Sequence, residues 1–177
     1  GRLLWDKGIR EYVEAAQLCR REGVSFSILG PLCTHVDFGP SGDWIEELGA
    51  SGIVEYLGMT DDVRAVVREA DCVVLPSYYG EGVPRSLLEG AAMGKPLITT
   101  DMPGCKAAVL DGISGLLCQP KSVHDLAEKI NEIADMTAEM RQAMGKQGRL
   151  FMEKNFDENL VLTEYHSRII ECLSSRN

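Results

Sequence analysis

The chain has 177 residues, 45% of them hydrophobic, which is enough to bury one core, so we expect a single domain over residues 1–177. Its 27 acidic residues outnumber its 18 basic residues, and the net charge of −9 argues against a surface that follows nucleic-acid phosphates. The sequence has no charged-then-apolar leader and no apolar run of the roughly 18 residues that a membrane helix needs. We therefore predict neither a membrane span nor a signal peptide.

The cysteines indicate a reducing compartment. They are scattered without CxxC or Cys/His ligand spacing, and most fall in apolar stretches, which is typical of reduced core residues in a cytoplasmic protein. The six are Cys19, Cys33, Cys72, Cys105, Cys118 and Cys172. Neither a disulfide framework nor a zinc site is expected, and we predict no metal and no cofactor.

Helical and strand-like patterns alternate along most of the chain. In chain order we predict a helix at 7–22, strand 24–29, helix 42–50, strand 53–57, helix 61–69, strand 72–76, helix 84–93, strand 96–100, a helical turn at 105–110, strand 115–118, and helices 122–135, 137–154 and 157–174. Such alternation implies crossover connections and an α/β fold with a doubly wound parallel sheet. With the apolar strand end that opens the chain, the sheet would have about six strands.

Two cations flank the first loop. Residues 1–8 run from an apolar strand end into an amphipathic helix, and Arg2 and Lys7 lie at either side of the connection. Loops at the carboxyl ends of parallel strands line the ligand crevice of an open α/β sheet. Arg2 and Lys7 can therefore clamp a diphosphate, although taken alone each would more often be an ordinary surface charge.

Two carboxylates bracket the start of the helix that follows residue 83. Pro84 suits the first helical position and Gly94 its end, so Glu81 falls in the loop and Glu89 inside the helix. The amides near the helix start belong to Gly82, Val83, Arg85 and Ser86. They face the positive end of the helix dipole, which is a phosphate site, and the carboxylates are left for hydroxyl groups.

Glu89 lies about 7–8 Å along the helix from Pro84, so Glu81 and Glu89 can address opposite ends of one elongated ligand. A sugar nucleotide has that layout, with a hexose, a pyrophosphate and a ribose. The alternative for an isolated pair is a loop acid and a solvated helix residue.

Five motifs follow one another along residues 1–135. They are Gly1-Arg2-Leu3 with Lys7-Gly8; Ile28-Leu29-Gly30; Tyr56-Leu57-Gly58 with Asp61-Asp62-Val63; Leu75-Pro76-Ser77 with Glu81, Glu89 and Pro96-Leu97-Ile98-Thr99-Thr100; and Asp111-Gly112-Ile113-Ser114-Gly115-Leu116-Leu117. In these motifs the chain resembles the C-terminal, donor-binding domain of a retaining GT-B glycosyltransferase of family 4, the "glycosyl transferases group 1" family. Its motif residues are most similar to those of the family members that build bacterial surface polysaccharides and lipopolysaccharides on lipid carriers.

The resemblance implies one half of a GT-B fold, Rossmann-like, with C-terminal helices and with the N-terminal acceptor domain absent from this chain. The donor would be a nucleotide diphosphate sugar such as a UDP-sugar. Arg2, Lys7 and the helix amides would neutralise the departing β-phosphate, Glu81 would contact the hexose, and Glu89 would accept from the ribose hydroxyls. The other donor-binding residues that it implies are Gly82, Val83, Arg85, Ser86 and Leu88, with the main chain of Met59 and Thr60 at the nucleobase.

The resemblance also implies transfer to a glycan or lipid-linked acceptor that binds the missing domain. The full-length enzyme would then be cytoplasmic and peripheral at the inner membrane, and this fragment would be inactive alone. Two departures from the family pattern are Ala107, where an acidic residue is usual, and Gly80, which lengthens the loop before Glu81. A sugar-nucleotide epimerase of related fold and a non-catalytic nucleotide-binding module remain alternatives.

The last predicted helix carries an apolar stripe. Its members are Leu160, Tyr165, Ile169, Ile170 and Leu173. In the family this helix crosses back to the N-terminal domain; the alternative is that the stripe packs on the sheet of this domain.

Overall fold

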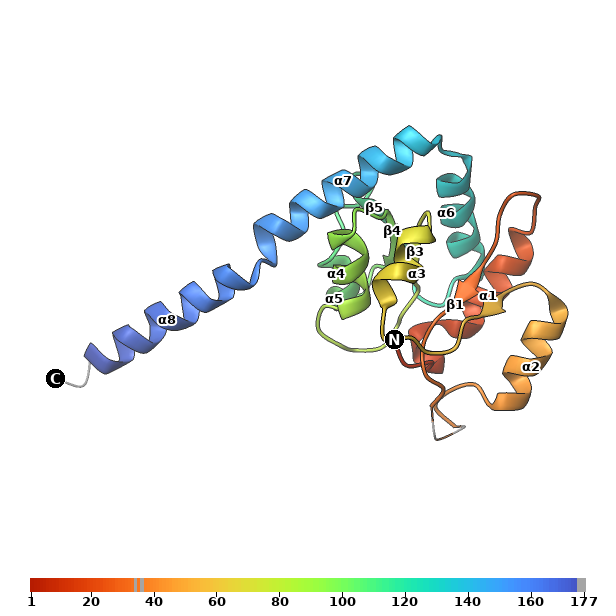
Figure 1. The fold of residues 1–177 in the computed structure, drawn as a ribbon, viewed down its shortest axis with the longest axis horizontal. Coiled ribbons are helices and arrows are strands. Elements are labelled where there is room, and N and C mark those ends of the chain that lie inside the picture. Colours follow the sequence, from red (N-terminus) through yellow and green to blue (C-terminus); the bar gives the residue numbers. More distant parts are fainter. Residues whose placement is uncertain (34, 36, 175–177) are drawn as a thin grey trace.

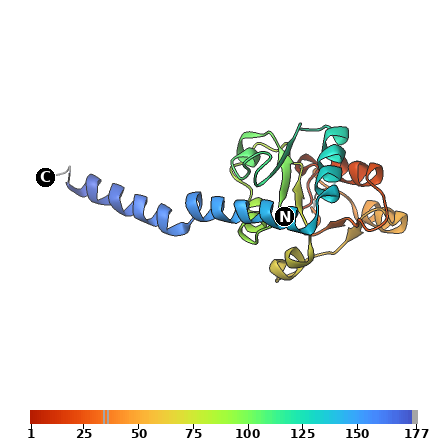
Figure 2. The ribbon, with the colours of Figure 1, turned by 90° about the horizontal axis from the view of Figure 1, so that it is seen from above.

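A computed structural model describes residues 1–33, 35 and 37–174, and within them helices and strands alternate up to the last three helices (Figures 1 and 2). The strands are β1 (Ser27–Ile28), β2 (Glu55–Tyr56), β3 (Val73–Leu75), β4 (Leu97–Thr100) and β5 (Gly115–Cys118). A 3₁₀ turn at Trp5–Lys7 precedes the helices α1 (Ile9–Leu18), α2 (Gly42–Ser51), α3 (Val63–Glu69), α4 (Arg85–Ala92), α5 (Pro103–Lys106), α6 (Val123–Asp135), α7 (Ala138–Asn155) and α8 (Glu158–Ser174). Each predicted helix and each strand predicted from residue 24 onward has a counterpart, whereas the strand predicted at the start of the chain does not form. The α/β class is confirmed.

The strands form two parallel sheets where we predicted one of about six strands. β1 pairs with β2, and β4 lies between β3 and β5. The opening segment adds only an isolated bridge between Leu3 and Leu32, and Leu3 N donates to Pro31 O at 2.9 Å. The same segment reaches the other sheet, because Tyr78 N donates to Asp6 O at 2.9 Å. It therefore joins the two sheets at one end without completing a strand between them.

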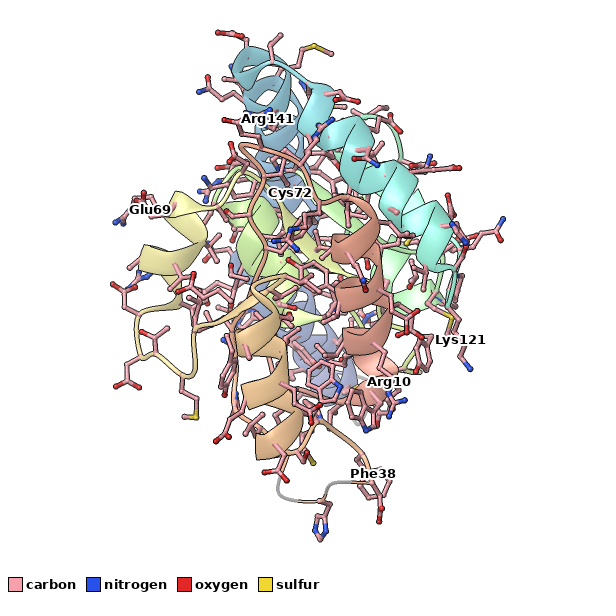
Figure 3. All side chains as sticks on the ribbon, turned by 90° about the vertical axis from the view of Figure 1, so that its right-hand side faces the viewer. Arg10, Phe38, Glu69, Cys72, Lys121 and Arg141 are labelled. Atoms are coloured by element: carbon pink, nitrogen blue, oxygen red, sulfur yellow. The ribbon has the colours of Figure 1, made fainter. Side chains whose placement is uncertain are left out.

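Helices cover both faces of the three-stranded sheet because neighbouring residues of β4 point in opposite directions. Ile98 packs in a cluster with α1 and α6, whereas Leu97 packs in a second cluster with α4 and α7. A third cluster joins α1 and α2 to β1, with Ile28 and Leu48 among its members. Figure 3 looks onto the side of the molecule where α1, α2 and α6 lie. The doubly wound arrangement is thus confirmed.

Several boundaries differ from the prediction for local reasons. α1 begins at Ile9 because Gly8, at φ +77°, adopts a left-handed conformation that ends the 3₁₀ turn. Pro84 is the residue before α4 and not its first residue. The short helix lies at Pro103–Lys106 and not at 105–110, because Pro103 takes the first helical position.

α8 projects away from the body of the protein (Figures 1 and 2). Its apolar stripe is exposed: Leu160 keeps 50% of its surface, Tyr165 65% and Ile169 57%. The alternative in which the stripe packs on this chain's own sheet is therefore wrong. Within the described residues, no helix is both long and apolar enough to cross a membrane.

Candidate functional site

A cavity of about 300 Å³ opens where the loops after β1, β2 and β3 meet the opening segment and α4. The predicted site residues that line it are Arg2, Lys7, Met59, Thr60, Ser86 and Glu89. They come from the opening segment, the loop after β2 and α4, so folding brings together residues almost ninety positions apart in the chain. The fold therefore gathers both predicted cations, the start of α4 and Glu89 around one cavity.

The remaining predicted residues lie beside the cavity and do not line it. Val83 and Leu88 are partly buried and pack against the cluster that joins α4 and α7. Arg85 is 90% exposed and pairs with Glu89 at 3.2 Å, one helical turn away. Gly82 lies in the exposed loop before α4. Donor-binding roles for these residues remain predictions.

Glu81 reaches the cavity through Lys7. The Lys7 ammonium donates to both oxygens of the Glu81 carboxylate, at 2.8 and 3.1 Å, and the two side chains are only 17% and 23% exposed. A half-buried pair of this kind holds both groups in place, because removing either one would leave an uncompensated charge. The sequence suggested separate partners for Lys7 and Glu81, and no local signal could have revealed their contact.

The start of α4 offers main-chain donors to the cavity. Pro84 has no side-chain cap for the helix, and its carbonyl accepts from Leu87 N at 3.1 Å and Leu88 N at 3.2 Å. The amides of Arg85 and Ser86 precede these bonded amides, in the turn where a helix leaves its N–H groups unpaired and its dipole is positive. Since Ser86 lines the cavity, an anion there would meet this helix end as well as the two cations.

The loop after β2 also lines the cavity. Gly58 O accepts from Gly30 N at 2.9 Å, and Met59, which follows, keeps 73% of its surface exposed. The Thr60 hydroxyl accepts from Asp62 N at 3.1 Å, in the turn that leads to α3. Because that hydroxyl is engaged locally, the main chain of Met59 and Thr60 is the part of this loop best suited to contact a ligand.

The arrangement suits an elongated ligand with an anionic centre and hydroxyl groups on either side. Arg2, Lys7 and the helix amides supply positive charge, whereas Glu81 and Glu89 supply acceptors for hydroxyl donors. Among the residues with assigned positions, no group of three or more His, Cys, Asp or Glu side chains could hold a metal ion.

Comparisons with known proteins agree on one family. The model of the family "Glycosyl transferases group 1" matches residues 1–151. The N,N'-diacetylbacillosaminyl-diphospho-undecaprenol alpha-1,3-N-acetylgalactosaminyltransferase of Campylobacter jejuni is 33% identical over 96% of this chain and 44% of its own length. The chain therefore spans less than half of that relative.

Solved structures show the same fold. HepE of Anabaena, determined in complex with UDP, aligns with a TM-score of 0.78 and 24% identity, over 99% of this chain and 47% of the other. The C-terminal domain of the group 1 glycosyl transferase LpcC of Francisella tularensis aligns with a TM-score of 0.74 and 21% identity, over 89% of this chain and 83% of that domain. With the family model matching most of its length, the chain belongs to the glycosyl transferases group 1 family.

Proposed function

We propose that this chain is the nucleotide-sugar-binding domain of a retaining GT-B glycosyltransferase. The observation that carries the proposal is the meeting of Arg2, Lys7 and the start of α4 with Glu89 in one cavity at the carboxyl ends of the strands. UDP in the structure of the similarly folded HepE makes a UDP-sugar our choice of donor.

In the proposed complex the diphosphate lies between Arg2, Lys7 and the amides of Arg85 and Ser86. These groups stabilise the charge that grows on the departing β-phosphate, which is an electrostatic role that requires no metal ion. Glu89 accepts from the ribose hydroxyls and Glu81 from the hexose, while the main chain of Met59 and Thr60 contacts the base.

The acceptor would bind to a part of the enzyme outside this chain. The name of the Campylobacter relative describes transfer of N-acetylgalactosamine to a sugar on diphospho-undecaprenol. By analogy, we propose transfer of a hexose or N-acetylhexosamine to a polysaccharide, lipopolysaccharide or lipid-linked acceptor, at the cytoplasmic face of a membrane. Alone, this domain would bind its donor and turn over little.

Calorimetry with UDP and UDP-glucose tests the proposed site. Glu89→Gln should weaken both ligands because both carry the ribose, whereas Glu81→Gln should weaken UDP-glucose more than UDP. Each loss should be about 1–2 kcal/mol, the scale of a charge-assisted hydrogen bond exchanged for a neutral one. Glu153→Gln is the matched control, since Glu153 also pairs with an arginine one turn away and is 50% exposed, against 46% for Glu89.

Three outcomes would contradict the proposal: no binding of either nucleotide, equal losses for both ligands in the Glu81 variant, or affinity that EDTA abolishes and magnesium restores. The intact protein with UDP-sugars and a lipid-linked acceptor then distinguishes the remaining classes. Glycosyl transfer supports the transferase, and epimerised donor without acceptor indicates an epimerase. Binding without either reaction indicates a nucleotide-binding module, which Ala107 in place of an acidic residue mildly favours.

A further inference from the structure

Gly104, in α5, touches the loop that carries Glu81. A Cβ atom at this position would lie 2.3 Å from Glu81 O and 2.4 Å from Gly82 O, distances at which main-chain atoms cannot remain. The φ angle of Gly104 is not in the left-handed region, so backbone conformation does not require glycine there. Position 104 therefore requires glycine because the loop lies too close to leave room for a side chain.

α5 is fixed more firmly than the loop. Thr100, just before α5, donates to Ser77 O through its hydroxyl, and Asp101 N donates to Cys118 O at 3.0 Å. Cys105, next to Gly104, is 1% exposed and packs in the cluster with α4 and α7. A side chain at position 104 would consequently displace the loop and not the helix.

The loop that carries Glu81 has room to move. Gly80 and Gly82 are exposed, and an added Cβ at either position would meet no atom within 4 Å. Glu81 N donates to Tyr79 O at 3.0 Å inside the loop, and the Glu81 carboxylate forms its ion pair with Lys7. Displacement of the Glu81 main chain would thus pull its carboxylate from the Lys7 ammonium.

We propose that Gly104 is a positioning residue of the donor site: by lacking a side chain it lets the Glu81–Gly82 main chain rest on α5, and this contact holds the Glu81 carboxylate on Lys7. The effect on nucleotide binding rests on the function proposed above. The effect on the ion pair does not, because it follows from the geometry of this chain alone.

Acetylation of Lys7, followed by peptide mass spectrometry without nucleotide, reads out the ion pair. Gly104→Ala should raise the rate of Lys7 acetylation about tenfold relative to that of Lys95, because the hydrogen bond between Lys7 and a charged group is lost. Glu81→Gln should have the same effect. Gly49→Ala is the control, since a Cβ there meets no atom within 4 Å and its φ is not left-handed. A variant with one glycine inserted after Gly80 lifts the loop without adding an atom to the core, and it should match Gly104→Ala.

Calorimetry with UDP-glucose gives the second readout. Gly104→Ala should weaken binding about tenfold, and the double variant with Glu81→Gln should bind no more weakly than Glu81→Gln alone, because both changes act through one carboxylate. A merely structural role would lower the melting temperature and leave the relative Lys7 rate unchanged, and that result overturns the proposal. If the wild-type chain binds neither nucleotide, the proposed function fails, and the acetylation rates still decide the role of Gly104.

Discussion

The two cations of the site, Arg2 and Lys7, differ in their exposure and in their contacts with other side chains. Arg2 is exposed at the rim of the cavity, whereas Lys7 is partly buried against Glu81. Arg2→Ala should therefore weaken UDP binding by about 1.5–3 kcal/mol with little change in stability. Lys7→Ala should weaken binding similarly and also lower the melting temperature, because it leaves Glu81 partly buried without its partner.

Calorimetry and thermal unfolding of the two variants measure both effects. Arg64→Ala serves as control, since its side chain is 84% exposed and does not line the cavity. Unchanged UDP affinity in both site variants would refute the diphosphate assignment.

The thiols respond to burial in a way that alkylation can measure. Burial, followed by the charge of Asp71, raises the pKa of Cys72 from 9.0 to about 12. Arg141 of α7 pairs with Asp71 at 3.3 Å beside this thiol (Figure 3). Because only the thiolate reacts, iodoacetamide at pH 8 should modify the exposed Cys172 and spare Cys72.

The same shift affects stability at alkaline pH. The unfolded chain loses the Cys72 proton near pH 9.0, whereas the folded chain keeps it until about pH 12. The free energy of unfolding is therefore unaffected by this thiol below pH 9.0 and falls as the pH rises from 9.0 toward 12. Urea unfolding between pH 8 and 10 should show the decline. Equal alkylation rates for Cys72 and Cys172 in the native protein would contradict the predicted shielding.

Among the helices, α4 and α7 pack with almost no space between their backbones. A Cβ atom on Gly145 of α7 would lie 1.8 Å from Gly94 O, just beyond α4, and Arg149 donates to Ala92 O at 2.6 Å. Gly145→Ala should therefore separate the helices and lower the free energy of unfolding by about 2–3 kcal/mol.

Gly49→Ala in α2 is the matched helical control for this prediction. It fills open space and should raise stability by about 0.5–1 kcal/mol through the lower entropy of the unfolded chain. Urea denaturation measures both variants. A loss at Gly145 no larger than the change at Gly49 would show that this contact is not tightly packed.

In the whole molecule, α8 stands apart from the core. The last side chain of the α4–α7 cluster is Phe156. Six large apolar side chains of α8 beyond it are exposed, namely Leu160, Leu162, Tyr165, Ile169, Ile170 and Leu173. Removing residues 158–177 should leave the melting temperature within about 2 °C, because little apolar area is lost from the core. It should also reduce binding of a hydrophobic dye such as ANS, since the exposed stripe is removed.

Circular dichroism melting and dye fluorescence on the full chain and the shortened chain make this comparison. A large fall in melting temperature would mean that α8 packs on the body in solution. Unchanged dye binding would show that the stripe is covered there.

The sequence by itself determined the order of helices and strands, the placement of Glu81 in a loop and Glu89 in a helix, and the two cations around one connection. These depend on local signals, namely apolar periodicity and the glycines and prolines that end elements, which a few neighbouring residues carry. The cavity lining of Arg2, Lys7, Ser86 and Glu89 was predictable for a related reason, since the carboxyl ends of parallel strands meet at one edge.

Only the tertiary structure decided which of these residues touch. Lys7 and Glu81 are 74 positions apart, and their pairing depends on how two loops are seated on the sheets. The approach of Gly104 to the Glu81 loop and the packing of Val83 and Leu88 against the α4–α7 cluster depend on the same tertiary contacts. Such contacts arise from the summed burial of many distant side chains, so no local pattern encodes them. For the same reason the sequence predicted one sheet where the structure has two, and it left the exposure of α8 open.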